Sequence, residues 1–180
     1  CRQDLCLAAP LMHIFDIETD GLLYNVTTIH CLVIHDTETG KTHVYNDKGT
    51  EEPTVRGIQV LEEADCIIGH NVVSYDLPVI SKLYPWFKYP DAVIDTLLLS
   101  RLYHPDLLAL DKKHNWETMP LKLYGRHGLE AYGHRLQEYK GDFGKDQEWA
   151  EWSQEMQDYC IQDVKVTTKL WEHFQPYLSG

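Results

Sequence analysis

The chain has 180 residues, of which 43% are hydrophobic and 24% are charged. This length suits one globular domain and excludes two ordinary ones. The balance of 16 basic against 28 acidic residues gives a formal charge of -12, which excludes a generally basic nucleic-acid-binding module. A nucleic acid would have to meet a local basic patch or bound cations. No apolar run approaches the roughly 20 residues of a membrane span, so no membrane partner is expected.

The cysteines predict reduced thiols and no metal knuckle. There are five of them, an odd number, and none forms a CxxC pair. Cys31, Cys66 and Cys160 lie within apolar stretches, which favours buried free thiols and a reducing cytoplasm. The histidines are scattered singly along the chain, so clustered zinc ligands are not expected.

The first 11 residues do not resemble a signal peptide, because their single Arg is followed by an acid and their apolar run is short. Met12 comes directly before the first strong strand pattern. We therefore expect residues 1–11 to be an extension outside the fold and residues 12–180 to form the functional domain.

The sequence of the first half of the domain predicts three strands, over residues 13–15, 29–35 and 42–45. We expect them to form an antiparallel meander. The first strand is expected to end at acidic residues, and the second is rich in β-branched side chains. A glycine in the connection 38–41 is typical of a hairpin.

Helices and strands then alternate, which predicts an α/β domain. We expect helices over residues 57–63, 76–83 and 96–103, and strands over residues 66–68 and 93–94. Asp95 precedes the third of these helices and is expected to cap it rather than to bind metal. Residues 105–128 show no clear period and are interpreted as a long irregular connection. Further helices are expected over residues 129–139 and about 149–174.

Four carboxylates stand at strand ends or in apolar surroundings: Asp16, Glu18, Asp76 and Asp163. Asp16 and Glu18 are two residues apart on a strand, so they point to the same face. Asp163 follows Tyr159 by four residues, which places a phenol and a carboxylate on one face of a helix.

Carboxylates that converge on one cleft repel one another unless a cation lies between them. Oxygen ligands suit Mg²⁺ or Mn²⁺. Two such ions about 4 Å apart can activate a water and stabilise the leaving oxygen in phosphodiester hydrolysis. The residues therefore predict a two-metal phosphodiesterase site.

Three motifs give the chain a resemblance to a known family. They are DIE at 16–18, HNxxxYD at 70–76 and YxxxD at 159–163. In order and separation they resemble the motifs of the DnaQ-like 3′→5′ exonucleases, which carry four acids and a tyrosine. The segments IDTLLLSRL at 94–102 and HGLEAYGHRL at 127–136 are similar to the proofreading domain of bacteriophage family A DNA polymerases. The resemblance runs from Met12 to about Phe174.

The resemblance implies an RNase H-like three-layer fold, with a mixed central sheet flanked by helices. It implies 3′→5′ hydrolysis of DNA that releases nucleoside 5′-monophosphates. By the same resemblance, Asp16 would bridge two divalent cations, Mg²⁺ or Mn²⁺. Glu18 and Asp163 would hold the cation that activates water, Asp76 would hold the other through solvent, and Tyr159 would orient the attacking water.

The resemblance also implies contacts with the substrate, a single-stranded or frayed DNA 3′ end. Thr19 and Leu22 fall where the family meets the terminal nucleotide, and Leu22 would wedge between the last two bases. Asn71 lies at the second motif beside the substrate. His127 is a further candidate for substrate contact. The chain departs from the family in the loop around 105–128 and in the extra N-terminal residues.

Two alternatives remain open at this point. One is an RNA-trimming exonuclease of the same fold, because no motif here reveals contacts to a 2′-hydroxyl. The other is a catalytically silent module that binds a strand or a polymerase. A family A polymerase domain or subunit is the protein partner that the resemblance implies, and the cytoplasm of a host cell is the location if a phage encodes the chain.

Overall fold

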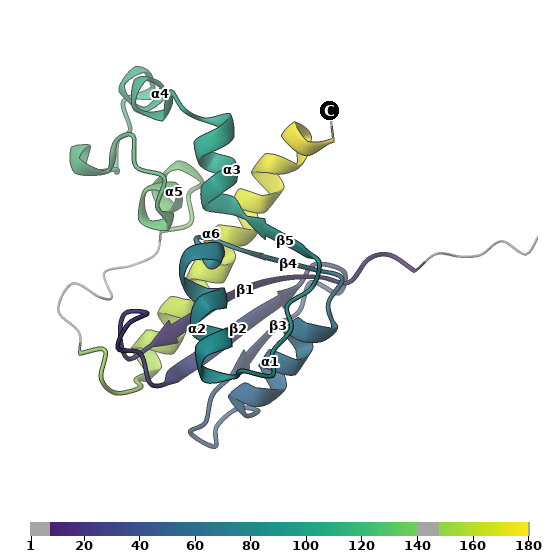
Figure 1. Cartoon of the computed structure of the whole chain (residues 1–180). Helices are drawn as coiled ribbons and strands as arrows, with labels where there is room; N and C mark the ends of the chain where they lie inside the picture. Colours follow the sequence, from purple (N-terminus) through teal and green to yellow (C-terminus); the bar gives the residue numbers. More distant parts are fainter. Residues whose placement is uncertain (1–7, 140–147, 180) are drawn as a thin grey trace, which may run out of the picture.

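A five-stranded mixed sheet forms the centre of the computed structural model, which describes residues 8–139 and 148–179 (Figure 1). The strand order is β3-β2-β1-β4-β5. β1 pairs antiparallel with β2 and parallel with β4, while β2–β3 is antiparallel and β4–β5 parallel. The strands are β1 (Met12–Thr19), β2 (Ile29–Asp36), β3 (Thr42–Tyr45), β4 (Cys66–Gly69) and β5 (Ala92–Asp95).

Helices cover both faces of this sheet, so the domain has three layers (Figure 1). They are α1 (Thr54–Glu63), the π-helix η1 (Val72–Asp76), α2 (Leu77–Leu83), α3 (Thr96–Tyr103), α4 (Leu107–His114), the 3₁₀ turn η2 (Leu121–Leu123), α5 (Leu129–Arg135) and α6 (Gln154–Leu178). Within residues 8–139 and 148–179, no helix has the length and apolarity needed to cross a membrane.

Side-chain alternation along β1 separates the two cores and places the acids. Phe15 and Ile17 lie in the cluster that packs under α1 and α2. Ile14 lies in the opposite cluster, with Cys160 and Val164 of α6. Because alternate strand residues share a face, Asp16 and Glu18 must also point to the α6 side.

The predicted α/β order, the antiparallel meander and the mixed sheet are confirmed. The first strand was expected over residues 13–15 with acids at its end, and β1 is longer, from Met12 to Thr19, so that Asp16 and Glu18 lie inside it. α6 begins at Gln154, where the Ser153 side chain accepts a hydrogen bond from the Met156 backbone. Leu11 exchanges hydrogen bonds with Asp65, and residues 1–7 of the expected extension lie outside the described residues.

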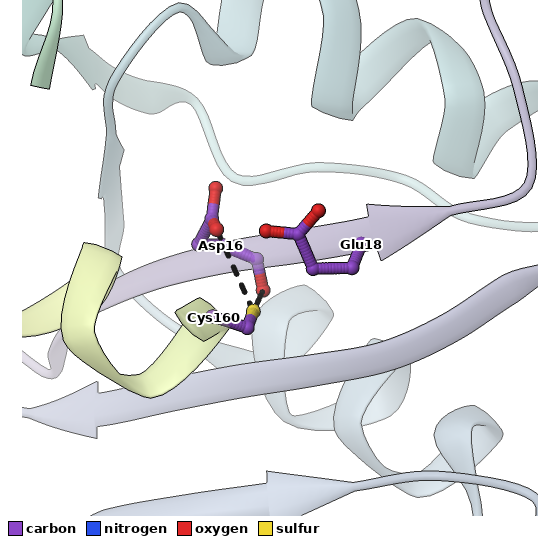
Figure 2. A group of neighbouring side chains, drawn as sticks. All are labelled: Asp16, Glu18 and Cys160. Carbon is purple, nitrogen blue, oxygen red and sulfur yellow. Dashed lines mark hydrogen bonds between the residues drawn. The ribbon is translucent and has the colours of Figure 1, made fainter. Parts of the chain in front are cut away.

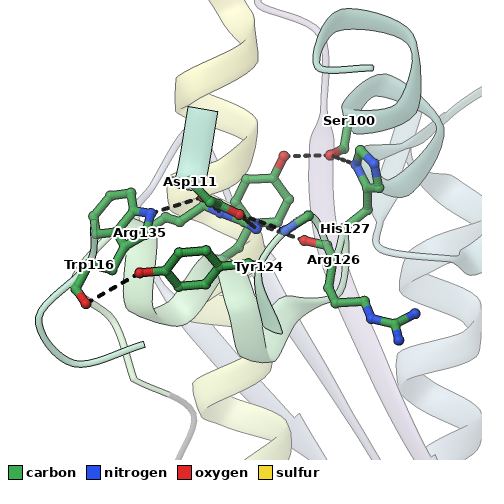
Figure 3. A network of polar contacts seen from close by, with 9 residues as sticks. Ser100, Asp111, Trp116, Tyr124, Arg126, His127 and Arg135 are labelled. Carbon is green, nitrogen blue, oxygen red and sulfur yellow. Dashed lines mark hydrogen bonds and ion pairs between the residues drawn. The ribbon is translucent and has the colours of Figure 1, made fainter. Parts of the chain in front are cut away.

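The prediction of an irregular connection over residues 105–128 is wrong, because α4 and η2 lie within it. The buried carboxylate of Asp111 organises this segment (Figure 3). It accepts hydrogen bonds from Trp116 Nε1 at 2.9 Å, from the Gly125 backbone at 2.7 Å and from Arg135 Nη2 at 2.6 Å. α4 buries Asp111 and one apolar side chain, Leu107, which explains why its hydrophobic period is weak.

Asp111→Asn should destabilise the fold by about 3–5 kcal/mol, because it leaves the Arg135 guanidinium buried without its counter-charge. Urea unfolding at neutral pH measures this loss. Asp106→Asn is the control, since Asp106 is exposed just before the same helix and makes no capping bond. Equal unfolding midpoints for the two variants would contradict the role given to Asp111.

The same pair predicts how stability depends on pH. Burial alone would raise the pKa of Asp111, but hydrogen bonds from Arg135, Gly125 and Trp116 outweigh it and lower the pKa. The stabilisation is therefore complete above the unfolded-state pKa of about 3.9 and is lost as pH falls through the lower folded-state pKa. The difference in stability between wild type and Asp111→Asn should shrink over that acid range.

Candidate active site

The carboxylates of Asp16 and Glu18 point to the same side of β1 (Figure 2). Their neighbours Phe15 and Ile17 are buried in the opposite core, which fixes the orientation of the strand. Glu18 is itself buried, and Asp16 is partly buried. Two acids are thus held next to each other by the pleat of one strand.

Helix α6 brings further groups to this face. Asp163 is buried on α6, three residues after Cys160. The Cys160 thiol lies 3.5 Å from both the Oδ2 and the backbone oxygen of Asp16 (Figure 2). Ligand atoms of Asp16, Glu18 and Cys160 all lie within 4.8 Å of one another. The sequence did not single out Cys160 for this place, although its i, i+3 spacing from Asp163 indicates a shared helix face.

The Cys160 thiol is held in its protonated form. Burial raises its pKa, and the neighbouring Cys31 thiol and the charges of Asp16 and Glu18 raise it further. The three described cysteines, Cys31, Cys66 and Cys160, are free and buried as predicted.

Asp76 enters the site from the end of η1. It is only 4% exposed, and the backbone of Ile17, between Asp16 and Glu18 on β1, donates a hydrogen bond to it. Burial raises the pKa of Asp76 well above its usual value, the hydrogen bonds from Ile17 and its own backbone oppose this, and the charges of Asp163 and Asp95 raise it further. β1, η1 and α6 therefore bring four predicted acids to one region.

This donor set fits a divalent cation. The Oδ2 atom of Asp76 is buried and has no hydrogen-bond partner among the described residues. A buried carboxylate oxygen without a partner is costly unless a cation or water satisfies it. Oxygen donors at this density suit Mg²⁺ or Mn²⁺, and Asp16, Glu18, Asp76 and Asp163 are the residues that could hold them.

The loop after β1 shapes a cavity of about 420 Å³ beside Glu18. A register shift between Glu18 and Thr19 ends the regular pairing and redirects the chain. The buried Thr19 hydroxyl lies 2.5 Å from the Tyr75 hydroxyl, and Tyr75 also donates to the Gly21 backbone at 2.5 Å. Leu22 lines this cavity and is 62% exposed.

Asn71 has a left-handed backbone with φ 63° at the start of η1. Its backbone N–H donates to Asp95 Oδ1 at 2.9 Å, and its side-chain oxygen accepts from Ser74. Asp95 also accepts from the Leu97 backbone at 2.9 Å, so the prediction that it caps α3 is confirmed. Asp95 thereby ties η1, which carries Asp76, to the start of α3.

The remaining candidates lie on different elements. Tyr159 is partly buried on α6, one helical turn before Asp163. The Nδ1 atom of His127 is 2.6 Å from Ser100 Oγ, within the network that joins α3 to α5 (Figure 3). Burial lowers the pKa of His127, as do the charges of Arg135 and Arg101. His127 is thus a neutral partner of Ser100 in this network.

Asp76→Asn should raise the melting temperature of the metal-free protein, because it removes a buried charge whose neighbours repel it. Each kcal/mol added to the free energy of unfolding raises the melting temperature by about 2–4 °C for a domain of this size. The increase in melting temperature caused by Mn²⁺ should shrink in the same variant, because one donor is lost. Thermal scans with chelator and with Mn²⁺ measure both effects.

The control for this experiment is Asp158→Asn, which changes an exposed acid on α6. Its melting temperatures should match those of wild type in both conditions. An Asp76→Asn protein that is less stable than wild type in chelator, with an unchanged Mn²⁺ response, would contradict the metal site.

Comparisons with known proteins agree with the resemblance to phage polymerases. The chain is 36% identical over 185 residues to the DNA-directed DNA polymerase of Enterobacteria phage T3, and 36% identical over 190 residues to that of Escherichia phage T7. Each match covers 89% of this chain and 26% of the polymerase. The chain therefore spans about a quarter of the length of these relatives.

Solved structures support the fold. Brucella melitensis NrnC with bound Mg²⁺ aligns with a TM-score of 0.58 at 19% identity, over 93% of this chain and 73% of that chain. The same protein bound to pGG aligns with a TM-score of 0.59 and the same identity and coverage. The RNase H superfamily matches residues 13–175. On that match, which covers most of its length, the chain belongs to the RNase H superfamily.

Proposed function

We propose that this domain, residues 12–180, is a metal-dependent 3′→5′ DNA exonuclease of the proofreading type, which releases nucleoside 5′-monophosphates. The observation that carries the proposal is the convergence of Asp16, Glu18, Asp76 and Asp163 from three elements, with a buried Asp76 oxygen that lacks a hydrogen-bond partner among the described residues. The likeness to phage DNA polymerases favours DNA as the substrate.

The acids would hold two divalent cations, Mg²⁺ or Mn²⁺. When bound, these cations supply Lewis-acid activation of a water and stabilisation of the leaving oxygen. Asp16 would contact both, Glu18 and Asp163 would hold the one on the side of the attacking water, and Asp76 would support the other through solvent. The Cys160 thiol, which donates to Asp16, would keep that carboxylate in place.

Five other residues would orient the reaction and its substrate. Tyr159 would orient the attacking water with its phenol, one helical turn from Asp163. Leu22, exposed at the cavity beside Glu18, would wedge between the last two bases of the 3′ end. Thr19, Asn71 and His127 are further proposed substrate contacts. A polymerase domain or subunit is the proposed protein partner.

Asp16→Ala should reduce hydrolysis by about a thousandfold or more, because it removes the carboxylate shared by both cations. The assay follows 5′-labelled DNA and identifies the products, since stepwise shortening and nucleoside 5′-monophosphates define 3′→5′ cleavage. A matched RNA strand tests the RNA-trimming alternative. Near-wild-type turnover by a folded Asp16→Ala protein at saturating Mn²⁺ would reject the assignment.

Tyr159→Phe should slow hydrolysis less than Asp163→Ala does, because the ring still packs and only the phenol is lost. The measurement is the single-turnover rate across a range of Mn²⁺ concentrations. If the Phe variant equals wild type throughout, Tyr159 is structural and the carboxylates alone carry the chemistry.

Leu22→Ala should lower the rate on duplex ends more than on single strands. A paired 3′ end must first fray and unstack, which costs about a few kcal/mol. A mismatched or single-stranded end does not bear this cost, because its terminal base is already unpaired. Initial rates on matched duplex, mismatched duplex and single strand test this. The control is Leu121→Ala, since Leu121 is 78% exposed on η2, away from the residues that line the cavity beside Glu18. Equal wild-type rates on all three substrates would reject the need for melting, and an unchanged duplex rate in Leu22→Ala would contradict the wedge.

A further inference from the structure

One donor in the acid site is not an oxygen. Cys160 faces Asp16 and Glu18 from α6, and the ligand atoms of the three residues lie within 4.8 Å of one another (Figure 2). We propose that Cys160 gives this site a second metal preference, so that Zn²⁺ binds through the Cys160 sulfur together with Asp16 and Glu18 and inhibits hydrolysis. The inhibition rests on the proposed function, whereas the Zn²⁺ site does not.

The distance between Cys160 and Asp16 fits a tetrahedral ion. Zn²⁺ binds sulfur at about 2.3 Å and carboxylate oxygen at about 2.0–2.2 Å. At a tetrahedral angle, two such donors lie about 3.5 Å apart. The Cys160 sulfur and Asp16 Oδ2 are 3.5 Å apart, so this pair matches the span before any side chain moves.

A separate observation also points to a cation here. The Oδ2 atom of Asp76 is buried without a hydrogen-bond partner among the described residues, and the Asp76 carboxylate lies against the backbone of Ile17. Ile17 stands between Asp16 and Glu18 on β1, so the Asp76 carboxylate meets the strand that carries two of the three donors. Structural zinc sites have four ligands.

Metal softness separates the two binding modes. Mg²⁺ and Mn²⁺ take carboxylate and water oxygens, and leave Cys160 as a thiol that donates to Asp16. Zn²⁺ also takes sulfur. On binding, the S–H bond breaks, the sulfur electron pair forms the bond to zinc, and the proton passes to solvent. Asp16 and Glu18 are then engaged in a tetrahedral arrangement that competes with the all-oxygen one.

Cys31 offers a competing account. It lies opposite Glu18 on β2, in the same buried cluster as Cys160, and the two thiols interact. A thiol pair could bind Zn²⁺ without the carboxylates. The test must therefore change Asp16 and Cys31 as well as Cys160.

The experiment uses Co²⁺ as a spectroscopic probe and Zn²⁺ as its competitor, on the full 180-residue chain. Cys1→Ser and Cys6→Ser are present in every sample, because these thiols would add signals of their own. The expected result is a thiolate-to-Co²⁺ charge-transfer band that Zn²⁺ abolishes. Cys160→Ser and Cys160→Ala should remove the band, and Asp16→Asn should weaken Co²⁺ binding by at least about tenfold. Cys66→Ser is the matched control and should retain the band.

Three results would overturn the proposal. The first is the absence of a thiolate band from the Cys160-containing protein at saturating Co²⁺. The second is a band that persists in folded Cys160→Ser. The third is a band that persists in Asp16→Asn and is lost in Cys31→Ser. The first needs no variant at Cys160, so misfolding of those variants does not remove the test. Circular dichroism establishes folding in each case.

A second readout separates this proposal from the proposed function. Zn²⁺ inhibition of Mg²⁺-driven DNA hydrolysis is measured for each variant relative to its own rate without Zn²⁺. Cys160→Ser should require at least about tenfold more Zn²⁺ for half-inhibition. A thiolate band in a chain that hydrolyses no DNA would reject the proposed function and support the Zn²⁺ site. DNA hydrolysis without a thiolate band would support the proposed function and reject the Zn²⁺ site.

Discussion

Repulsion among buried carboxylates is the constraint on which this structure depends. Glu18, Asp76 and Asp163 are each less than one-tenth exposed, and they come from three different elements. Such groups lose hydration and repel one another, which appears directly in the raised pKa of Asp76 through burial and the charge of Asp163. Without cations, these carboxylates therefore destabilise the folded state, and the rest of the fold must offset that cost.

The surrounding architecture supplies what this arrangement requires. Two hydrophobic cores hold β1 from both faces, so the pleat alone decides that Asp16 and Glu18 point to α6. Asp95 joins η1 to α3, and Asp111 closes the α4–α5 segment through Arg135. Each of these acids is satisfied within the protein by donors. The Oδ2 atom of Asp76 has none among the described residues, and this contrast separates a structural acid from a candidate metal ligand.

Sequence patterns predicted the parts that depend on local periodicity. The second strand was readable from its β-branched residues, and the cap at Asp95 and the long helix with Tyr159 and Asp163 were readable from spacing. α4 was missed because it buries one acid of an ion pair and a single leucine, which is too little to form an apolar stripe. The position of Cys160 beside Asp16 was missed because it depends on contacts between α6 and β1, which join residues 144 apart in the chain.

The four acids are proposed to form a two-cation hydrolytic site. Anomalous diffraction from crystals soaked in Mn²⁺ tests it most directly, because the method locates each ion without relying on activity. Two Mn²⁺ peaks are expected, one in contact with Asp16, Glu18 and Asp163 and the other shared with Asp16 on the side of Asp76. No peak among these residues at saturating Mn²⁺, or a peak only elsewhere on the surface, would contradict it.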